Sequence, residues 1–468
     1  MTNTFTYKEK QYSIENAEYD FEKNTVLFNS NIPPAMFLHL EPECFPDKKI
    51  TFQYNNTNVE GTVEAVYAAH CSVLPKQEVI IKAHVKDVHS FSPPCGRLAF
   101  RIPHLSIHFY DQVTEKTFKN GAYFGDCDHA ALHLNNHQWI LRDCYKTPAD
   151  DIIPLDIYVE TQNKSPEKED KTNHSLLEIE LSSPDELEMI EKEATIICCL
   201  LGIAKGRRIM WDSLWQIDEG IVNFCKTSHL TASTNKNDAS IIPDNPDRYL
   251  YDFIEKAYTE YKKSPEWWDN ILWNFTLSNE LSIIETSGMI QSILLERICS
   301  EIYPSLSSNT PQIGNGITEC LNDEEKKKKL TSELHELFEK REPNWTPNHS
   351  HNIIETISRW NVEPSYLKKI GEVLKYGGFS GKINADYIRQ RHQLLHTGKL
   401  NLSQVDGSMI DYFANTSLYT TSLVLAMLNY KGFFFALGNL YDMNTIMPQA
   451  DKLRHSSENK IADPTPKN

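Results

Sequence analysis

The spacing of hydrophobic residues changes near residue 182, and the predicted type of structure changes with it. Before that point, short segments alternate apolar and polar residues or are rich in β-branched residues, and turn-forming Asn, Pro, Gly and Asp separate them. Typical segments are KITFQY, TVEAVY, EVIIKAHV, RLAFRI and HQWILRD. This pattern predicts a β-rich antiparallel domain over residues 1–182.

Beyond residue 182, apolar residues recur at intervals of three and four, as they do on one face of a helix. Ser183 or Asp185 is placed to cap a helix that leads into the apolar run IICCLLGIA, and NDASIIPDNPD interrupts the pattern. We therefore expect a helical connector over residues 183–247, an α-helical domain over 248–451 and a flexible polar tail over 452–468. The predicted fold class is α+β, with an antiparallel β-rich N-terminal domain followed by an all-α helical bundle.

Length and charge limit the possible functions. The chain has 468 residues and a net charge of −17, so it is long enough for two or three cores and is not coated with the positive charge that nucleic-acid binding uses. Eight basic and three acidic residues between Arg359 and Asn401 nevertheless leave a local excess of positive charge. No export signal opens the sequence, and no apolar run reaches the roughly 18 to 20 residues of a membrane span. We expect a cytoplasmic protein that does not enter a membrane.

The segment NADYIRQRHQLLHTGKL holds the main candidate for chemistry. Arg391 and His396 have the spacing R-x4-H on a predicted helix that Asn384 or Asp386 can cap and that Gly398 can end. At about 100° per residue the two side chains are about 140° apart, so they share a rim that a second subunit can complete. Spacing alone is weak support, because Arg97 and Arg101 lie at R-x6-H from His104 and His108 in sequence that predicts strands. The capped helix, the basic surroundings and the long apolar helix that follows distinguish Arg391 and His396.

This segment resembles the signature of HEPN ribonucleases, in which a polar residue follows the arginine. The arrangement of a β-rich N-terminal region before a C-terminal HEPN domain is similar to that of ApeA-like anti-phage proteins, and the similarity covers nearly the whole chain. One position departs from the pattern, because His392 stands where the family usually has asparagine.

The resemblance implies an endoribonuclease that acts in abortive infection without a metal or another cofactor. His396 would take the proton from a ribose 2′-hydroxyl and Arg391 would bind the phosphate, leaving a 2′,3′-cyclic phosphate. Arg389 also lies at R-x6-H from His396, so either arginine can hold the phosphate. Lys382 and Lys399, with Arg389, can guide RNA, with tRNA as the expected substrate, and Glu285 or Glu296 can orient Arg391. We expect a homodimer or a higher homo-oligomer that forms through the HEPN domain and answers to a phage-derived trigger.

Simpler interpretations stay open at the sequence level. Arg391 can form a surface ion pair while His396 stabilises a helix end, and the other charged residues can be solvated. The helices can also bind RNA or a partner without cutting it. A third alternative is a metal-dependent activity in the N-terminal domain around His129, because residues 104–144 are rich in metal-ligand types, although they lack CxxC, HxH and HExxH motifs. These residues are His104, His108, Asp126, Cys127, Asp128, His129, His133, His137 and Cys144.

Overall fold

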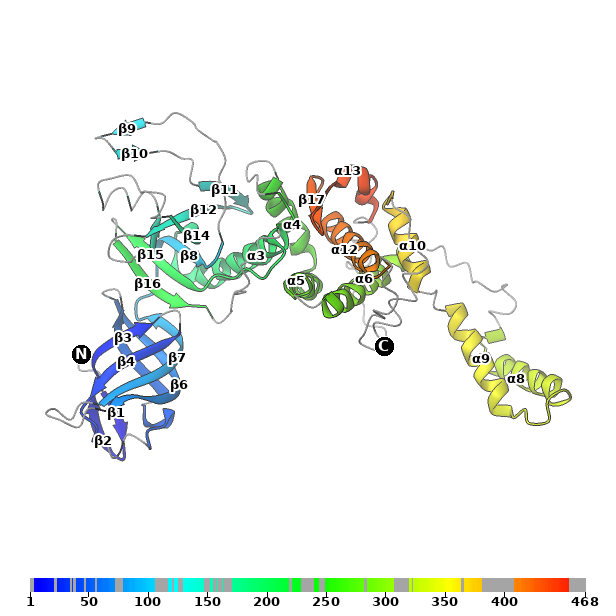
Figure 1. The fold of residues 1–468 in the computed structure, drawn as a ribbon, viewed down its shortest axis with the longest axis horizontal. Helices are drawn as coiled ribbons and strands as arrows, with labels where there is room; N and C mark the ends of the chain where they lie inside the picture. The colour runs from blue at the N-terminus through cyan, green and yellow to red at the C-terminus, as the bar shows by residue number, and fades with distance from the viewer. Residues whose placement is uncertain are drawn as a thin grey trace. The chain divides into compact units, whose positions relative to one another are not determined.

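The computed structural model has the predicted α+β class, with antiparallel strands in its first half and helices in its second (Figure 1). It divides into two compact units, unit 1 (Met1–Thr259) and unit 2 (Glu260–Asn468). The residues that the structure describes are 4–20, 23–33, 36, 39–45, 48–54, 57–71, 79–105, 117–119, 122–124, 129–146, 152–154, 158, 162, 171–218, 221–228, 240–243, 249–281, 284–306, 320–321, 323–362, 366–380 and 408–453.

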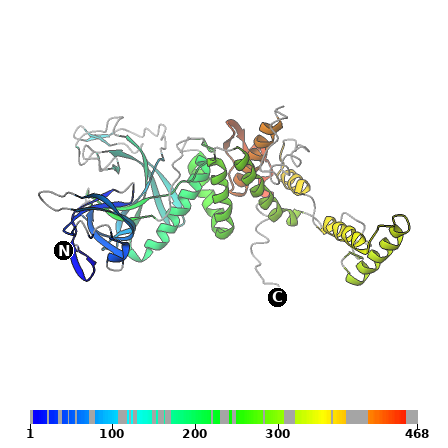
Figure 2. The same ribbon diagram turned by 60° about the horizontal axis from the view of Figure 1, so that its bottom comes forward.

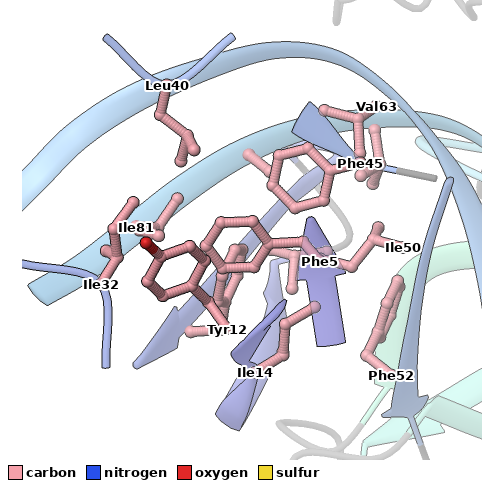
Figure 3. Packing of buried hydrophobic residues seen from close by; sticks show 14 of the residues in the cluster. Phe5, Tyr12, Ile14, Ile32, Leu40, Phe45, Ile50, Phe52, Val63 and Ile81 are labelled. Atoms are coloured by element: carbon pink, nitrogen blue, oxygen red, sulfur yellow. The ribbon is translucent and has the colours of Figure 1, made fainter. Parts of the chain in front are cut away.

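The first half of unit 1 is an antiparallel β-structure with an aromatic core. Its elements are β1 (Thr4–Tyr7), β2 (Lys10–Ser13), β3 (Glu15–Asp20), β4 (Thr25–Ser30), the short 3-10 helix η1 (Pro42–Cys44), β5 (Lys49–Tyr54), β6 (Thr57–Cys71) and β7 (Val79–Ser90). Strand β7 lies between β4 and β6, β3 pairs with β4, and β5 pairs with β6. Figure 3 shows how Phe5 and Phe45 stack at the centre of this core, with ring centroids 5.0 Å apart.

Strand β7 shows how the sequence pattern produces this core. Val79, Ile81, Ala83 and Val85 alternate with more exposed residues, as one face of a strand requires, and all four are buried. The next buried residue, Val88, comes after three positions because Asp87 has a φ of 55° and β7 carries an extra residue opposite β6 at this point. The bulge therefore keeps the apolar face of β7 turned inward.

The second half of unit 1 is a further set of antiparallel strands with one long helix. Its elements are β8 (Gly96–Ile102), β9 (Thr117–Lys119), β10 (Ala122–Phe124), β11 (His129–Leu134), β12 (His137–Lys146), β13 (Ile152–Pro154), β14 (Lys171–Leu181), η4 (Pro184–Glu186), α3 (Leu187–Lys205), β15 (Ser213–Asp218) and β16 (Ile221–Thr227). The strand order is β11-β12-β14-β8-β15-β16, and a single pair, Lys226 with His89, joins β16 to β7. Helix α3 lies against this sheet (Figure 2), where Glu191 binds Lys226 and Glu193 binds Trp139.

Residues 183–247 are not the helical connector that the sequence predicted. Helix α3 occupies the first part, but SLWQID and IVNFCKT form β15 and β16, which complete the sheet of unit 1. Their alternating β-branched and aromatic residues favour strands, and Leu214 and Phe224 are buried. Unit 1 therefore ends at Thr259, beyond both predicted boundaries, 182 and 247.

Unit 2 is a helical bundle with one small β-hairpin. Its elements are α5 (Pro265–Glu280), α6 (Ile284–Leu306), α8 (Glu324–Glu339), α9 (Pro347–Val362), α10 (Tyr366–Tyr376), α12 (Ser408–Met427), β17 (Phe433–Ala436), β18 (Asn439–Asp442) and α13 (Met443–Ile446). Helix α4 (Tyr251–Lys263) begins in unit 1 and ends in unit 2. Helix α6 packs against α5, α10 and α12, whereas α8 and α9 pack against each other. The hairpin β17–β18 departs from the all-α domain that was predicted.

None of the helices within the described ranges has both the length and the apolar character that a membrane crossing requires.

Candidate functional site

The predicted reactive residues belong to a segment of unit 2 between helices α10 and α12. Arg391, His396 and His392, and the predicted RNA-binding residues Lys382, Arg389 and Lys399, all lie in residues 381–407, outside the described residues. Their grouping stays a prediction. The structure does describe the helices at both ends of the segment.

The N-terminal end of the segment is fixed by the end of α10. Gly378 has a φ of 78°, and the backbone N–H of Phe379 donates to the carbonyl of Leu374 at 2.8 Å, which closes the helix in a left-handed cap. The ring of Phe379 then packs on Tyr419 of α12, with centroids 5.1 Å apart, and the N–H of Ser380 donates to the carbonyl of Ile446. The chain therefore leaves α10 at a defined point beside α12.

The C-terminal end of the segment leads into α12, which is tied to its neighbours by a buried hydroxyl network. Tyr412 lies one turn into α12, and its hydroxyl is 2.5 Å from the Ser292 hydroxyl of α6. The hydroxyl of Tyr366, the first residue of α10, donates to the backbone carbonyl of Ser292 at 3.0 Å. Ser292 is fully buried and Tyr412 nearly so. Because buried hydroxyls are costly to leave unpaired, this network fixes the junction of α6, α10 and α12.

The two predicted supporting residues fall at nearby positions around helix α6, and the structure describes the side chain of Glu296 but not that of Glu285. Glu285 and Glu296 are eleven positions apart, which corresponds to a rotation of about 20° on a helix, and Ser292 falls on the same stripe. Glu296 is half-buried and its charge helps to raise the pKa of Cys299, although burial of the thiol is the main cause. Ser292 of this stripe contacts Tyr412 of α12. Helix α12 is the helix that follows Arg391 and His396 in the chain.

Unit 1 contains a buried carboxylate that the sequence analysis missed. Glu193 of α3 is only 5% exposed, and its two oxygens accept four hydrogen bonds. Asn135 Nδ2 and the Tyr258 hydroxyl donate to Oε1, each at 2.6 Å, and His137 Nδ1 at 2.8 Å and Trp139 Nε1 at 3.3 Å donate to Oε2. We call Glu193 and these four donors the Glu193 cluster. It joins α3, the β11–β12 hairpin and α4.

Hydrogen bonding keeps Glu193 charged in this setting. Burial raises the pKa of the carboxyl, but the hydrogen bonds from Tyr258, His137 and Asn135 outweigh burial, so the pKa lies below its usual value. Burial, and then the hydrogen bond to Glu193 and its negative charge, raise the pKa of Tyr258. The cluster is therefore a carboxylate held by neutral donors and one imidazole.

Those metal-ligand residue types of 104–144 that the structure describes are not gathered in one place. A turn at Asn135 separates His133 from His137, which lie on different strands and on opposite faces of the sheet. His137 binds Glu193, and burial raises the pKa of Cys144 well above its usual value. Among the described residues, no group of three or more His, Cys, Asp or Glu side chains is arranged to hold a metal ion. His108, Asp126, Cys127 and Asp128 lie outside those residues.

The other arginines with R-x6-H spacing are ion-paired in strand β8. Arg97 and Arg142 both bind the buried carboxylate of Glu178 at 2.9 Å, and Arg101 binds Asp212 at 2.7 Å. Two guanidiniums around one buried carboxylate satisfy its lone pairs, which a single partner does not do. These arginines therefore support the sheet of unit 1, and their strand position is the one that the sequence predicted.

Comparison with known proteins gives no relative from which to transfer a function: no family model, no curated protein and no solved structure matches this chain.

Proposed function

We propose that this protein is a metal-independent endoribonuclease of the HEPN type that acts in the cytoplasm in anti-phage abortive infection, in the manner of ApeA-like proteins. The observation that carries the proposal is the R-x4-H pair, Arg391 and His396, in a basic segment that leads into a long apolar helix. The α+β architecture supports it, because a β-rich unit precedes a helical one, as in the family that the sequence resembles.

The proposed reaction uses the two residue types for different tasks. His396 takes the proton of the ribose 2′-hydroxyl, the 2′ oxygen forms a bond to phosphorus, and the bond from phosphorus to the 5′ oxygen breaks. Arg391 neutralises the charge that builds on the phosphate oxygens, and the departing 5′ oxygen takes a proton from an imidazolium. The products are a 2′,3′-cyclic phosphate and a 5′-hydroxyl.

The helical frame offers this chemistry a rigid support. The chain leaves α10 and enters α12 at points held by α6 and α13, and Glu296 lies on the same stripe of α6 as Ser292, which contacts Tyr412 of α12. We propose that a homodimer or higher homo-oligomer brings two such segments together over one RNA, with tRNA as the expected substrate and Lys382, Arg389 and Lys399 along the phosphates. We also propose that unit 1 responds to a phage-derived trigger and restrains the nuclease at rest.

Sequencing of RNA ends after induction tests the proposal. Wild type should produce 5′-hydroxyl and 2′,3′-cyclic phosphate ends at defined positions, and Arg391→Ala and His396→Ala should abolish them. Arg389→Ala tests the neighbouring arginine, and His351→Ala is the matched control, because His351 is an exposed histidine on helix α9 of unit 2. A synthetic substrate with a 2′-deoxyribose at the cut position should resist cleavage, because the nucleophile is missing.

The outcomes separate an enzyme from a binding module. Loss of cleavage with retained RNA binding in His396→Ala supports the enzyme. If every variant and the wild type bind RNA but none cleaves it, even in cells that contain the trigger, a non-catalytic module is supported. Cleavage that survives His396→Ala and stops on addition of a chelator would instead support the metal-dependent alternative.

A further inference from the structure

Helix α4 carries the chain from unit 1 into unit 2, and each half of it has its own partners. In unit 1, Glu255 accepts a hydrogen bond from the backbone N–H of His133 at 2.9 Å, and Tyr258 binds Glu193. In unit 2, the Tyr261 hydroxyl donates to Asp269 of α5 at 2.5 Å. Glu255, Tyr258 and Tyr261 follow one another at intervals of three, so they are spread over an arc of about 120° around the helix, with Tyr258 in the middle.

The unit 1 half of α4 is held at the tip of one hairpin. Asn135 has a φ of 53° in the turn between β11 and β12, and its Nδ2 atom contacts both Glu193 and the Tyr258 hydroxyl, the latter at 2.9 Å. Tyr258 and Glu193 are 3% and 5% exposed. The turn, α3 and α4 thus meet at a single buried charge.

Such a contact is strong when complete and unstable when partly broken. Hydrogen bonds to a charged group contribute more than those between neutral groups, and a buried carboxylate that loses donors keeps its desolvation cost. Displacement of the hairpin tip removes donors from Asn135 and His137 together, because both belong to the same turn region. The cluster therefore favours two states, a closed one with all donors bound to Glu193 and an open one with the hairpin tip displaced, over intermediate states.

We propose that the Glu193 cluster is a latch by which the β11–β12 hairpin of unit 1 holds helix α4, and that opening it loosens α4 and, through Tyr261 and Asp269, helix α5 of unit 2. One part of this proposal rests on the proposed function: the binding of a trigger to unit 1 opens the latch, and this change is passed on to the ribonuclease segment. The mechanical part stands without any nuclease activity.

Amide hydrogen exchange of the full-length protein tests the latch. Tyr258→Phe removes the hydroxyl and keeps the ring, and Glu193→Gln removes the charge at nearly constant size. Both should speed exchange in peptides covering Tyr251–Lys263 and Pro265–Glu280 by about tenfold or more, the loss expected for a hydrogen bond to a buried charge. The double variant should exceed the larger single effect only slightly, because both changes act on one contact.

Glu188→Gln is the matched control. Glu188 lies on the same helix as Glu193, is exposed and pairs with the neighbouring Lys192, so exchange in α4 and α5 should stay at the wild-type rate. Unchanged exchange of α4 in Tyr258→Phe, or faster exchange that stops before α5, overturns the latch. Tyr258→Phe keeps all buried carbon atoms, so it provides the decisive comparison if Glu193→Gln fails to fold.

RNA ends measured on the same variants keep the two proposals apart. Faster exchange together with increased cleavage that His396→Ala abolishes supports both. Faster exchange with no cleavage by any form supports the latch and overturns the nuclease. Cleavage by wild type that Tyr258→Phe leaves unchanged, despite faster exchange, overturns the link between them.

Discussion

Acidification from pH 7 to pH 5 should destabilise unit 1 through a single histidine, His174. This residue of β14 is half-buried beside His104, with ring centroids 5.8 Å apart, and near the Arg101–Asp212 ion pair. Burial, then the charge of Arg101, lowers the pKa of His174 from 6.5 to about 4, while Asp212 raises it. Its Nδ1 atom is buried and has no hydrogen-bond partner among the described residues.

The direction and size of the effect follow from this pKa. His174 is neutral in the folded protein between pH 6.5 and 4 but takes up a proton on unfolding, so the free energy of unfolding falls as the pH drops through that window. With pKa values of 6.5 unfolded and about 4 folded, the loss between pH 7 and pH 5 is about 1.8 kcal/mol. The ring keeps some exposure to solvent, which screens the interaction and lowers the expected loss to roughly 1 kcal/mol.

Amide exchange in β8 and β14, corrected for the intrinsic effect of pH, measures this stability locally in the full-length protein. Wild type should lose roughly 1 kcal/mol between pH 7 and pH 5, and His174→Gln should lose markedly less, because glutamine does not titrate. His133→Gln is the control, since His133 is an exposed histidine in the same sheet. Equal pH dependence in wild type and His174→Gln, or titration of the His174 ring near pH 6.5 by NMR, would refute the reasoning.

Two further substitutions test how charge and backbone conformation support the units. Glu178→Gln should lower the free energy of unfolding in urea by about 3 kcal/mol, because it leaves Arg97 and Arg142 without their shared carboxylate. Glu180→Gln, at the next position on the same face of β14, is exposed and should lower it by less than about 0.5 kcal/mol. Equal losses in the two variants would contradict a structural role for the buried charge. Gly378→Ala should lower the thermal midpoint more than Gly438→Ala. Both glycines have a φ near 78°, so alanine is strained at either position. A Cβ at 378 would in addition lie 3.1 Å from Pro448, whereas one at 438 would meet no atom within 4 Å. The reverse order would show that the α10 cap is not packed as described.

The sequence predicted the fold class because local pattern carries it. Alternation in segments such as VIIKAHV indicates strands, and the change to intervals of three and four after residue 182 marks α3. It missed β15 and β16 because their place in the sheet depends on pairing with β8, more than a hundred residues earlier in the chain. It also missed β17–β18, although Leu437 and Gly438, with φ of 46° and 77°, form a two-residue turn between alternating residues.

The candidate residues divide in a similar way. Arg391 and His396 follow from spacing and context, which are properties of the sequence, and their grouping in space stays a prediction. Glu193 was not predicted, since an acidic residue on a helix is usually solvated. One signal was present: Glu193 follows Ile190 by three and precedes Ile197 by four, so it falls on the apolar stripe of α3. Its partners, Asn135 and Tyr258, are distant in sequence and were not predictable.

The late position of β15 and β16 also governs the order in which the polypeptide matures during translation. Strands β8 and β7 cannot be bridged until residues 213–227 have left the ribosome, so the first 182 residues emerge as an incomplete sheet that needs protection from misassembly. The ribosome then requires on the order of ten seconds to reach the codon for His396. Each new molecule therefore has time to finish its N-terminal half before the arginine and histidine near its C-terminus have been made.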